Sequence, residues 1–256
     1  EIKLSSFGRR TVLSLRQNLA SRILDLEKAN LYEKYSEKVG EIVTGEVYQV
    51  WKKEILVLDD EDNELILPKS EQIPNDFFRK GDSIRAIVAR VEMINNTPRI
   101  ILSRTANEFL ERLFEQEVPE IFDGTIEIKS VSREAGSRTK IAVFSKEEDV
   151  DPVGACIGPR GQRVSNIVDA LGGEKIDIVK YNDDVPTYIA AALAPADVVG
   201  VEILDEEARS CRATVPDDQL SLAIGNKGQN VRLAAKLTGW KIDIKPESGF
   251  YDGTQQ

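Results

Sequence analysis

The sequence has 256 residues, which is long for a single small core and suits two or three small domains. Apolar residues make up 41% of it and charged residues 30%, so we expect a folded globular chain and exclude a disordered one. Its formal net charge of −10 argues against unspecific binding to a nucleic-acid duplex, because phosphate affinity normally comes from an excess of Lys and Arg. Any nucleic-acid binding must therefore be local.

The composition lacks side chains on which many enzymes depend. There is no histidine, and the two cysteines, Cys156 and Cys211, are far apart and lack CxxC spacing, so we expect no catalytic site, metal site, cofactor or disulfide. No run of eighteen apolar residues and no signal-peptide pattern occurs, which predicts a cytoplasmic protein with no membrane partner. Because the chain begins at Glu1 instead of Met, we expect it to be a piece of a longer protein.

The first expected element is a helix over residues 12–37, within a connecting segment that covers residues 1–37. Its apolar residues recur at mostly helical spacing: Val12, Leu15, Leu19, Ile23, Leu26 and Leu31. This helix is predicted to lead into the next domain.

Residues 38–104 contain short stretches that alternate between apolar and polar residues. They predict five strands, over residues 43–51, 54–58, 64–67, 83–92 and 99–103. Residues 59–63, 80–82 and 95–98 are rich in Asp, Asn, Gly and Pro and are expected to form turns. Five short strands fit a small oligonucleotide-binding barrel.

An internal repeat follows the barrel. Residues 157–164, IGPRGQRV, align with residues 224–231, IGNKGQNV, and the KIDI of residues 175–178 aligns with that of residues 241–244. Because both motifs recur in the same order at almost the same separation, we expect two copies of one fold. The predicted domains are residues 105–182 and 183–256.

Each copy has the same expected order of elements. A helix around residues 109–114 or 188–194 precedes two strands, at 125–131 and 140–144 or at 199–204 and 212–215. Asp151 with Pro152, and Asp217 or Asp218, are predicted to cap a short helix that runs into the glycines. A second helix then ends at Gly172 or Gly239, and the KIDI strand closes the copy. This order is that of the bacterial type II KH domain, so the whole chain is predicted to be an α+β multidomain protein.

The loop between the two helices of each copy contains the residues that we expect to bind a ligand. Paired glycines let the backbone approach a ligand closely, and the N–H groups of the following helix favour phosphate. One loop is Gly158-Pro159-Arg160-Gly161 and the other is Gly225-Asn226-Lys227-Gly228. Arg160 and Lys227 each add one cation, and the residues after the loops are expected to reach bases or phosphates: Arg163, Gln229, Asn230 and Arg232.

A single GxxG is weak support, since it also describes an ordinary helix–helix corner. Two copies, each with a basic third residue, favour an RNA clamp. Neither loop has the GxxxxGK[ST] spacing of a nucleotide-binding P-loop.

Two further surfaces are candidates for RNA contact. In the KIDI strands, Ile178 and Ile244 are expected beside the binding groove, although packing alone also explains apolar residues there. In the barrel, an aromatic plane and nearby cations give a second candidate RNA face: Trp51, Lys52, Lys53 and Arg90. Trp51 covering the end of the barrel is the alternative reading.

Longer stretches resemble the NusA family of bacterial transcription factors. They are LSRT at residues 102–105, FEQEVPEI at 114–121, GSRTK at 136–140, DPVGACIGPRG at 151–161, LGGEKIDI at 171–178, DDQLSLAIG at 217–225 and GWKIDI at 239–244. The resemblance implies an S1 barrel followed by two type II KH domains, which bind nascent single-stranded RNA. It also implies a role in pausing, termination and antitermination.

The resemblance implies partners as well: RNA polymerase, and other elongation and antitermination factors, with the protein itself a monomer. The family's amino-terminal polymerase-binding domain is represented here only by the connecting helix. The barrel has KEILV at residues 53–57 where many S1 domains carry a glycine and phenylalanines, which leaves its share of RNA binding open.

Two other classes of function remain. A ribonuclease fragment, such as the S1 and KH modules of polynucleotide phosphorylase, would need a catalytic core outside these modules, and no carboxylates stand at metal-binding spacing. A KH scaffold that binds only protein would tolerate loss of the two loop cations, yet both are present. We therefore expect a preference for single-stranded RNA over duplex.

Overall fold

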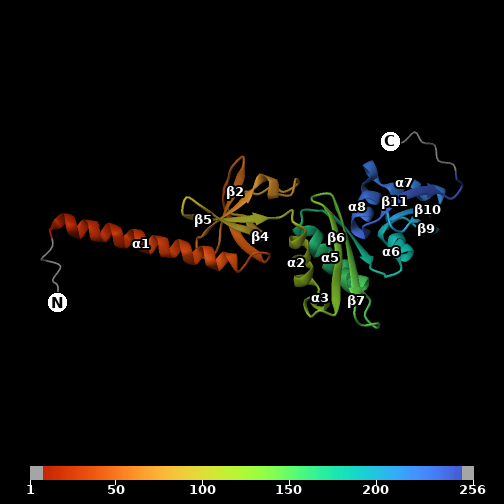
Figure 1. Ribbon diagram of the computed structural model, residues 1–256, viewed down its shortest axis with the longest axis horizontal. Helices are drawn as coiled ribbons and strands as arrows, with labels where there is room; N and C mark the ends of the chain where they lie inside the picture. The colour runs from red at the N-terminus through yellow and green to blue at the C-terminus, as the bar shows by residue number, and fades with distance from the viewer. Residues whose placement is uncertain (1–7, 250–256) are drawn as a thin grey trace. The chain divides into compact units, whose positions relative to one another are not determined.

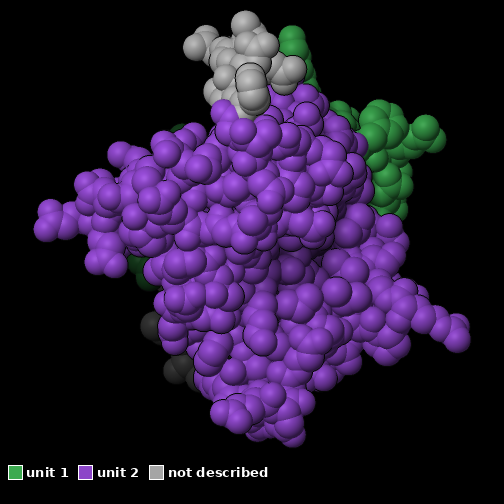
Figure 2. Space-filling view, turned by 90° about the vertical axis from the view of Figure 1, so that its right-hand side faces the viewer, with its two compact units in different colours: residues 1–72, 77–109 green, residues 73–76, 110–256 purple. Residues whose placement is uncertain are grey.

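The computed structural model describes residues 8–249, so the expectations for residues 1–7 and 250–256 lie outside the described residues. The chain divides into two compact units, which Figure 1 traces along the chain and Figure 2 distinguishes by colour. Unit 1 comprises residues 1–72 and 77–109, and unit 2 comprises residues 73–76 and 110–256.

The first element of unit 1 is the expected helix, α1 (Arg9–Ser36). Most of its apolar side chains are exposed, and burial begins only near its end, at Tyr35. The Tyr35 hydroxyl donates a hydrogen bond to the carboxylate of Asp59, and Lys34 pairs with Glu61 at 2.9 Å. The last turn of α1 is therefore fastened to the turn at residues 59–63.

The rest of unit 1 is a closed five-stranded barrel, which confirms the five expected strands (Figure 1). The strand order is β1-β2-β3-β5-β4, in which only β3 and β5 pair in parallel. The strands are β1 (Ile42–Val50), β2 (Glu54–Leu58), β3 (Glu64–Pro68), β4 (Ser83–Ile94) and β5 (Thr97–Ser103), with a 3-10 turn, η2 (Lys69–Glu71). Alternate residues of each strand fill the core, as period-two patterning requires.

One turn of the barrel is shorter than predicted. The expected turn at residues 95–98 shrinks to Asn95 and Asn96, both with positive φ, of 50° and 59°. Asparagine tolerates this left-handed backbone, and a two-residue turn of this kind matches the twist of a hairpin. Pro98 consequently lies inside β5, opposite Met93.

Unit 2 contains both copies of the repeat except for residues 107–109, which open the first copy and belong to unit 1. The first copy consists of α2 (Asn107–Glu117), α3 (Pro119–Phe122), β6 (Ile126–Glu134), β7 (Arg138–Ser145), α4 (Pro152–Ile157), η3 (Pro159–Gly161), α5 (Gln162–Ala170) and β8 (Lys175–Lys180). The second copy consists of α6 (Val185–Ala192), β9 (Gly200–Asp205), β10 (Ser210–Val215), η4 (Asp217–Gln219), α7 (Leu220–Ile224), η5 (Asn226–Gly228), α8 (Gln229–Thr238) and β11 (Lys241–Pro246).

The two sheets have the same topology, which confirms the repeat and the mixed α+β class. In each sheet the middle strand pairs antiparallel with the strand before it and parallel with the KIDI strand, giving the orders β6-β7-β8 and β9-β10-β11. Asp151 caps α4 as predicted, and its carboxylate accepts from the N–H of Val153. The predicted cap at Asp217 or Asp218 is wrong, because these residues begin η4 and the Asp217 carboxylate instead accepts from the N–H of Ser248.

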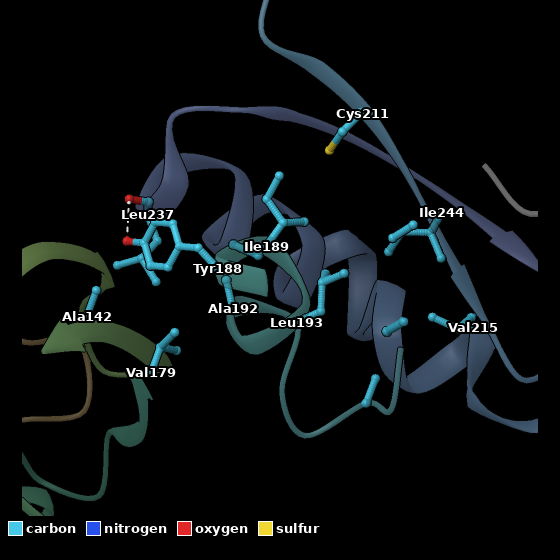
Figure 3. Packing of buried hydrophobic residues seen from close by; sticks show 14 residues of the cluster. Ala142, Val179, Tyr188, Ile189, Ala192, Leu193, Cys211, Val215, Leu237 and Ile244 are labelled. Carbon is cyan, nitrogen blue, oxygen red and sulfur yellow. Dashed lines mark hydrogen bonds between the residues drawn. The ribbon is translucent and has the colours of Figure 1, made fainter. Parts of the chain in front are cut away.

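The two copies share one hydrophobic core. Ala142 of β7 and Val179 of β8 belong to the same buried cluster as Tyr188, Ile189 and the other core residues of the second copy (Figure 3). The outer face of the first sheet is thus covered by the second copy. Burial on both faces explains why β7 is buried over five consecutive residues, Thr139–Val143, while β10 alternates.

Candidate nucleic-acid interface

Each GxxG loop joins two helices at a sharp corner in which the first glycine is required by close packing. Gly158 and Gly225 have φ of 75° and 80°. A Cβ atom on Gly158 would lie 2.5 Å from Cγ of Arg163, and one on Gly225 would lie 2.7 Å from the backbone nitrogen of Asn230. The second helix therefore packs directly on the loop, and its first N–H groups stay close to the loop surface.

The third residue of each loop is the exposed cation that the sequence indicated. Arg160 and Lys227 both have left-handed backbone, with φ of 56° and 54°, and both side chains are exposed. Within residues 8–249 neither side chain forms an ion pair. Pro159 and Asn226 are exposed beside them. Each loop thus presents one positive charge to solvent that is not neutralised by an ion pair within the described residues.

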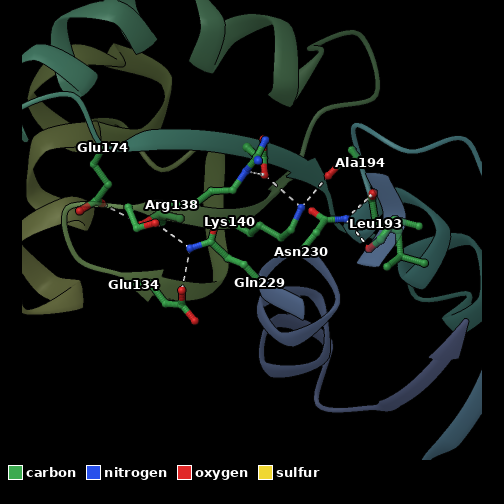
Figure 4. Close-up of polar contacts among 12 residues, drawn as sticks. Glu134, Arg138, Lys140, Glu174, Leu193, Ala194, Gln229 and Asn230 are labelled. Carbon is green, nitrogen blue, oxygen red and sulfur yellow. Dashed lines mark hydrogen bonds and ion pairs between the residues drawn. The ribbon is translucent and has the colours of Figure 1, made fainter. Parts of the chain in front are cut away.

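Arg163 and Asn230 occupy the same position of the repeat, and both brace a loop. The Arg163 guanidinium donates to Glu120 at 3.0 Å and to the carbonyl oxygen of Ala155 at 2.8 Å. Asn230 is only 2% exposed, and its amide donates to carbonyl oxygens of Leu193 and Ala223 (Figure 4). This places Asn230 in the support of the second loop and not on its outer surface.

Gln229 and Arg232 are held by the first copy. Gln229 Nε2 donates to Glu134 Oε2 at 2.8 Å and to Ser137 Oγ at 2.7 Å (Figure 4). Arg232 Nε donates to Glu134 Oε1 at 2.6 Å, and its Nη1 donates to the carbonyl oxygen of Lys227. The hydrogen bond from Arg232 holds the pKa of Glu134 below its usual value and raises the pKa of Arg232.

A pocket lies where the first sheet meets the second loop. Its volume is about 390 Å³, and residues of both copies line it: Ser137, Arg138, Lys175, Ser221, Leu222, Gly225, Asn226, Gln229 and Asn230. Arg138 is neutralised by Asp177, whereas Lys175 is exposed at the start of β8. The sequence did not single out Lys175 or Glu134 as site residues, because nothing local shows that β6 and β8 of one copy lie beside the loop of the other.

The two KIDI isoleucines occupy different environments. Ile178 of β8 is half-buried, whereas Ile244 of β11 is 6% exposed and belongs to the core of the second copy. Ile178 therefore has surface to offer a ligand, and Ile244 supports its strand from inside.

In the barrel, the structure brings three of the four candidate residues together. Trp51, Lys52 and Lys53 are all exposed in the turn between β1 and β2. Arg90 lies on β4 and pairs with Glu92 at 2.6 Å. An exposed aromatic residue that the sequence analysis did not select is Phe77, over whose ring the Arg79 guanidinium lies at 5.5 Å. The signal for it was the Phe-Phe-Arg-Lys run at residues 77–80.

Residues 8–249 contain no group of three or more acidic or cysteine side chains arranged to hold a metal ion. In the same range, no helix has the length and apolar character needed to cross a membrane.

Comparison with known proteins identifies the family. Models of the NusA-like first KH domain and the NusA-like second KH domain match residues 104–181 and 185–251. Three relatives are each named "Transcription termination/antitermination protein NusA". The chain is 48% identical to that of Halalkalibacterium halodurans, over 97% of this chain and 64% of the relative. For Bacillus subtilis the identity is 47%, over 97% and 66%, and for Mycobacterium tuberculosis strain H37Rv it is 44%, over 94% and 72%.

The chain thus spans just under two thirds of the length of the first two relatives. The match to both KH models in tandem, and the identity across most of the mycobacterial relative, show that this chain belongs to the NusA family.

Proposed function

We propose that this chain is the single-stranded RNA-binding part of a bacterial transcription factor, and that it modulates pausing, termination and antitermination by binding nascent RNA. One observation carries the proposal: two GxxG loops, each with an exposed cation that has no ion pair within residues 8–249, are held in one compact unit. The names of the relatives support the role in termination and antitermination.

In this proposal each loop clamps the sugar-phosphate backbone. The loop glycines allow close approach, the helix N–H groups face the phosphates, and Arg160 or Lys227 adds a charge. Ile178, which is half-buried, would contact RNA held by the first loop. Arg163, Asn230 and Ile244 act by holding the loops and strands in place, since each is committed to contacts inside the protein.

The core shared by the two copies favours a single RNA strand that contacts both loops. Because the two copies are packed together, the second loop would meet an RNA strand already bound to the first copy, at high local concentration. A pocket lined by residues of both copies, among them Lys175 and residues of the second loop, supports such a shared path. The gain therefore depends on RNA long enough to reach both loops.

The remaining expectations belong to the same proposal. The domain limits are residues 1–37, 38–104, 105–182 and 183–256, and the turn at Trp51 to Lys53 is a secondary RNA face. The protein would be a cytoplasmic monomer without catalytic activity. Its contacts with RNA polymerase would be made mainly through the family's amino-terminal domain, and other elongation and antitermination factors would be further partners.

The test uses one double variant for each loop. Pro159→Asp with Arg160→Asp, and Asn226→Asp with Lys227→Asp, place like charges against the phosphates on exposed corners. Fluorescence anisotropy should show a large loss of affinity for an RNA of roughly ten nucleotides, and a much smaller loss for one of about four nucleotides that fits the unchanged groove. Duplex RNA should bind more weakly than single-stranded RNA in the parent.

The matched control is Ala208→Asp with Arg209→Asp, in the exposed turn between β9 and β10, which changes the net charge by the same amount. It should retain parental RNA affinity. If the loop variants stay folded by circular dichroism and bind the long RNA as tightly as the parent, the loops are not the clamp. A protein-binding scaffold would then be the better description.

A further inference from the structure

A carboxylate of the first copy occupies hydrogen-bond donors beside the loop of the second. Glu134, the last residue of β6, accepts from Arg232 Nε with one oxygen and from Gln229 Nε2 with the other. Gln229 is the first residue of α8, directly after the loop, and Arg232 reaches back to the carbonyl oxygen of Lys227 within it. Both donors therefore lie at the edge of the second loop.

The first loop has no such arrangement within the described residues. Gln162, which aligns with Gln229, donates to Asn166 of its own helix. Ser165 stands at the position of Arg232. The carboxylate that pairs with Arg163 is Glu120, from the first copy itself. Among residues 8–249, only the second clamp receives an acidic side chain from the neighbouring copy.

The two contacts of Glu134 resemble those of a phosphate. A guanidinium N–H and an amide N–H on two separate oxygens of one anion are the donors that proteins use for the RNA backbone. Because the pKa of Glu134 is held below its usual value, the side chain is ionised throughout the physiological range. The pair is partly exposed, with side chains 44% and 25% accessible for Arg232 and Glu134, so an incoming anion can reach it.

We propose that Glu134 is an affinity-setting residue of the second clamp, an internal competitor that holds Arg232 and Gln229 away from RNA phosphates. This inference rests on the proposed RNA-binding function. While Glu134 is engaged, Lys227 supplies the charge of the second loop and Arg232 contributes little. The RNA affinity of the second copy is then set by a residue of the first.

Removing the charge need not separate the two copies. They also share the apolar core around Ala142 and Val179, and Lys140 donates to the carbonyl oxygen of Ala194. Glu134→Gln keeps the size of the side chain and one of its acceptors. The urea midpoint of this variant should therefore stay near that of the parent.

The experiment measures the second clamp alone, in the background of Pro159→Asp with Arg160→Asp. Glu134→Gln should bind single-stranded RNA about fivefold more tightly at low salt, the effect of removing one unit charge about 4 Å from a phosphate in water. The plot of log affinity against log salt should steepen by about 0.7, as for one added phosphate contact with a single strand.

Two controls separate this role from a general charge effect. Glu127→Gln removes the same charge on the same strand, but about 23 Å away along it. The two variants are compared at 0.1 M salt, where this distance exceeds the screening length of about 10 Å, so Glu127→Gln should not change the affinity. In Arg232→Gln, adding Glu134→Gln should no longer steepen the salt dependence, because the released guanidinium is absent.

A Glu134→Gln variant with unchanged or weaker RNA binding and an unchanged salt slope would overturn the inference and leave Glu134 as a docking residue only. This outcome is distinct from failure of the proposed function. If the proposed function is wrong, Asn226→Asp with Lys227→Asp would also leave RNA binding unchanged. That result would contradict both the proposed function and the inference about Glu134.

Discussion

The ammonium of Lys140, on β7 of the first copy, donates a hydrogen bond of 2.6 Å to the carbonyl oxygen of Ala194 in the second copy. The side chain is fully buried, and it also pairs with Asp177 at 3.0 Å (Figure 4). Burial lowers the pKa of Lys140, against the opposing effect of Asp177. A buried charge is tolerated here because the two partners satisfy it, and one of them belongs to the other copy.

Lys140→Ala should destabilise unit 2 and weaken the coupling between its copies. It leaves Asp177 short of a partner and the Ala194 carbonyl without its donor, in a buried place where breaking an ion pair costs about 3 kcal/mol. Urea unfolding followed by Trp240 fluorescence, in a Trp51→Phe background, would report this loss. Affinity for the long RNA should fall, and affinity for the short RNA should not.

The second copy offers a matched control for Lys140. Arg212 on β10 pairs with Asp243 in the same register as Lys140 with Asp177, but both side chains are partly exposed. Arg212→Ala should change stability by about 0.5 kcal/mol or less, as expected of an exposed pair. Equal losses for the two variants would contradict the role given to Lys140.

Glu174 is the second buried charge whose removal should be costly. Its carboxylate accepts from Arg133, from the N–H of Gly136 and from Thr139 Oγ1, and both charged side chains are essentially inaccessible. Glu174→Gln removes the negative charge with which the buried Arg133 guanidinium pairs, for which we expect a loss of about 3–5 kcal/mol.

The urea midpoint measures the effect of Glu174→Gln, with the exposed Glu147→Gln as a control that should match the parent. Replacing both partners with apolar residues, as Arg133→Met with Glu174→Leu, should recover much of the loss, because neither charge of this pair is then left buried. If Glu174→Gln alone is neutral, the ion pair does not stabilise the hairpin between β6 and β7.

Tyr35→Phe should destabilise unit 1 in a pH-dependent way. Burial alone would raise the pKa of Asp59, but hydrogen bonds from Tyr35, Asn63 and the backbone outweigh it and hold that pKa below its usual value. The stability that ionised Asp59 contributes is present above its ordinary pKa and is lost as the pH falls through the lowered value. Removing the hydroxyl should cost about 1.5–3 kcal/mol near neutral pH.

This deficit of Tyr35→Phe should shrink as the pH is lowered below about 4, where Asp59 begins to take up a proton. Trp51 fluorescence in a Trp240→Phe background would follow the unfolding of unit 1. Tyr48→Phe, which alters a half-exposed tyrosine on β1, serves as the control and should show no deficit at any pH. If the loss of stability in Tyr35→Phe did not change with pH, Asp59 would not be the partner of the Tyr35 hydroxyl.

Both cysteines should be unreactive in the folded protein. Cys156 and Cys211 are fully buried, and burial raises the pKa of their thiols to about 12 and about 11. Since the thiolate is the reactive form, a disulfide reagent at about pH 8 should label neither until urea is added. Ser70→Cys, on the exposed η2 turn, should add one rapidly labelled thiol. Rapid labelling of the parent would show that the core of either copy opens.

The sequence by itself determined the elements, their order and the loops. Helical and period-two spacing, turn residues and glycines act over a few residues, so local chemistry predicts them without the fold. The repeat of IGxxGQ and KIDI then revealed two copies, and the cations at Arg160 and Lys227 followed from the motif. The errors, at Pro98 and at the Asp217 cap, fell at element ends, where the choice between neighbouring turn residues depends on what surrounds them.

Only the tertiary structure decided which face of each copy is covered. Ala142 and Val179 of the first sheet are buried by the second copy, whereas Thr214 and Lys245, at the same positions of the second sheet, are not. Likewise, Asn230 follows its loop as Arg163 does but is sealed inside, and Glu134 meets Arg232 across almost a hundred residues. Such contacts join residues that are far apart in the chain. A local sequence pattern cannot predict them, because burial depends on how the two copies pack against each other.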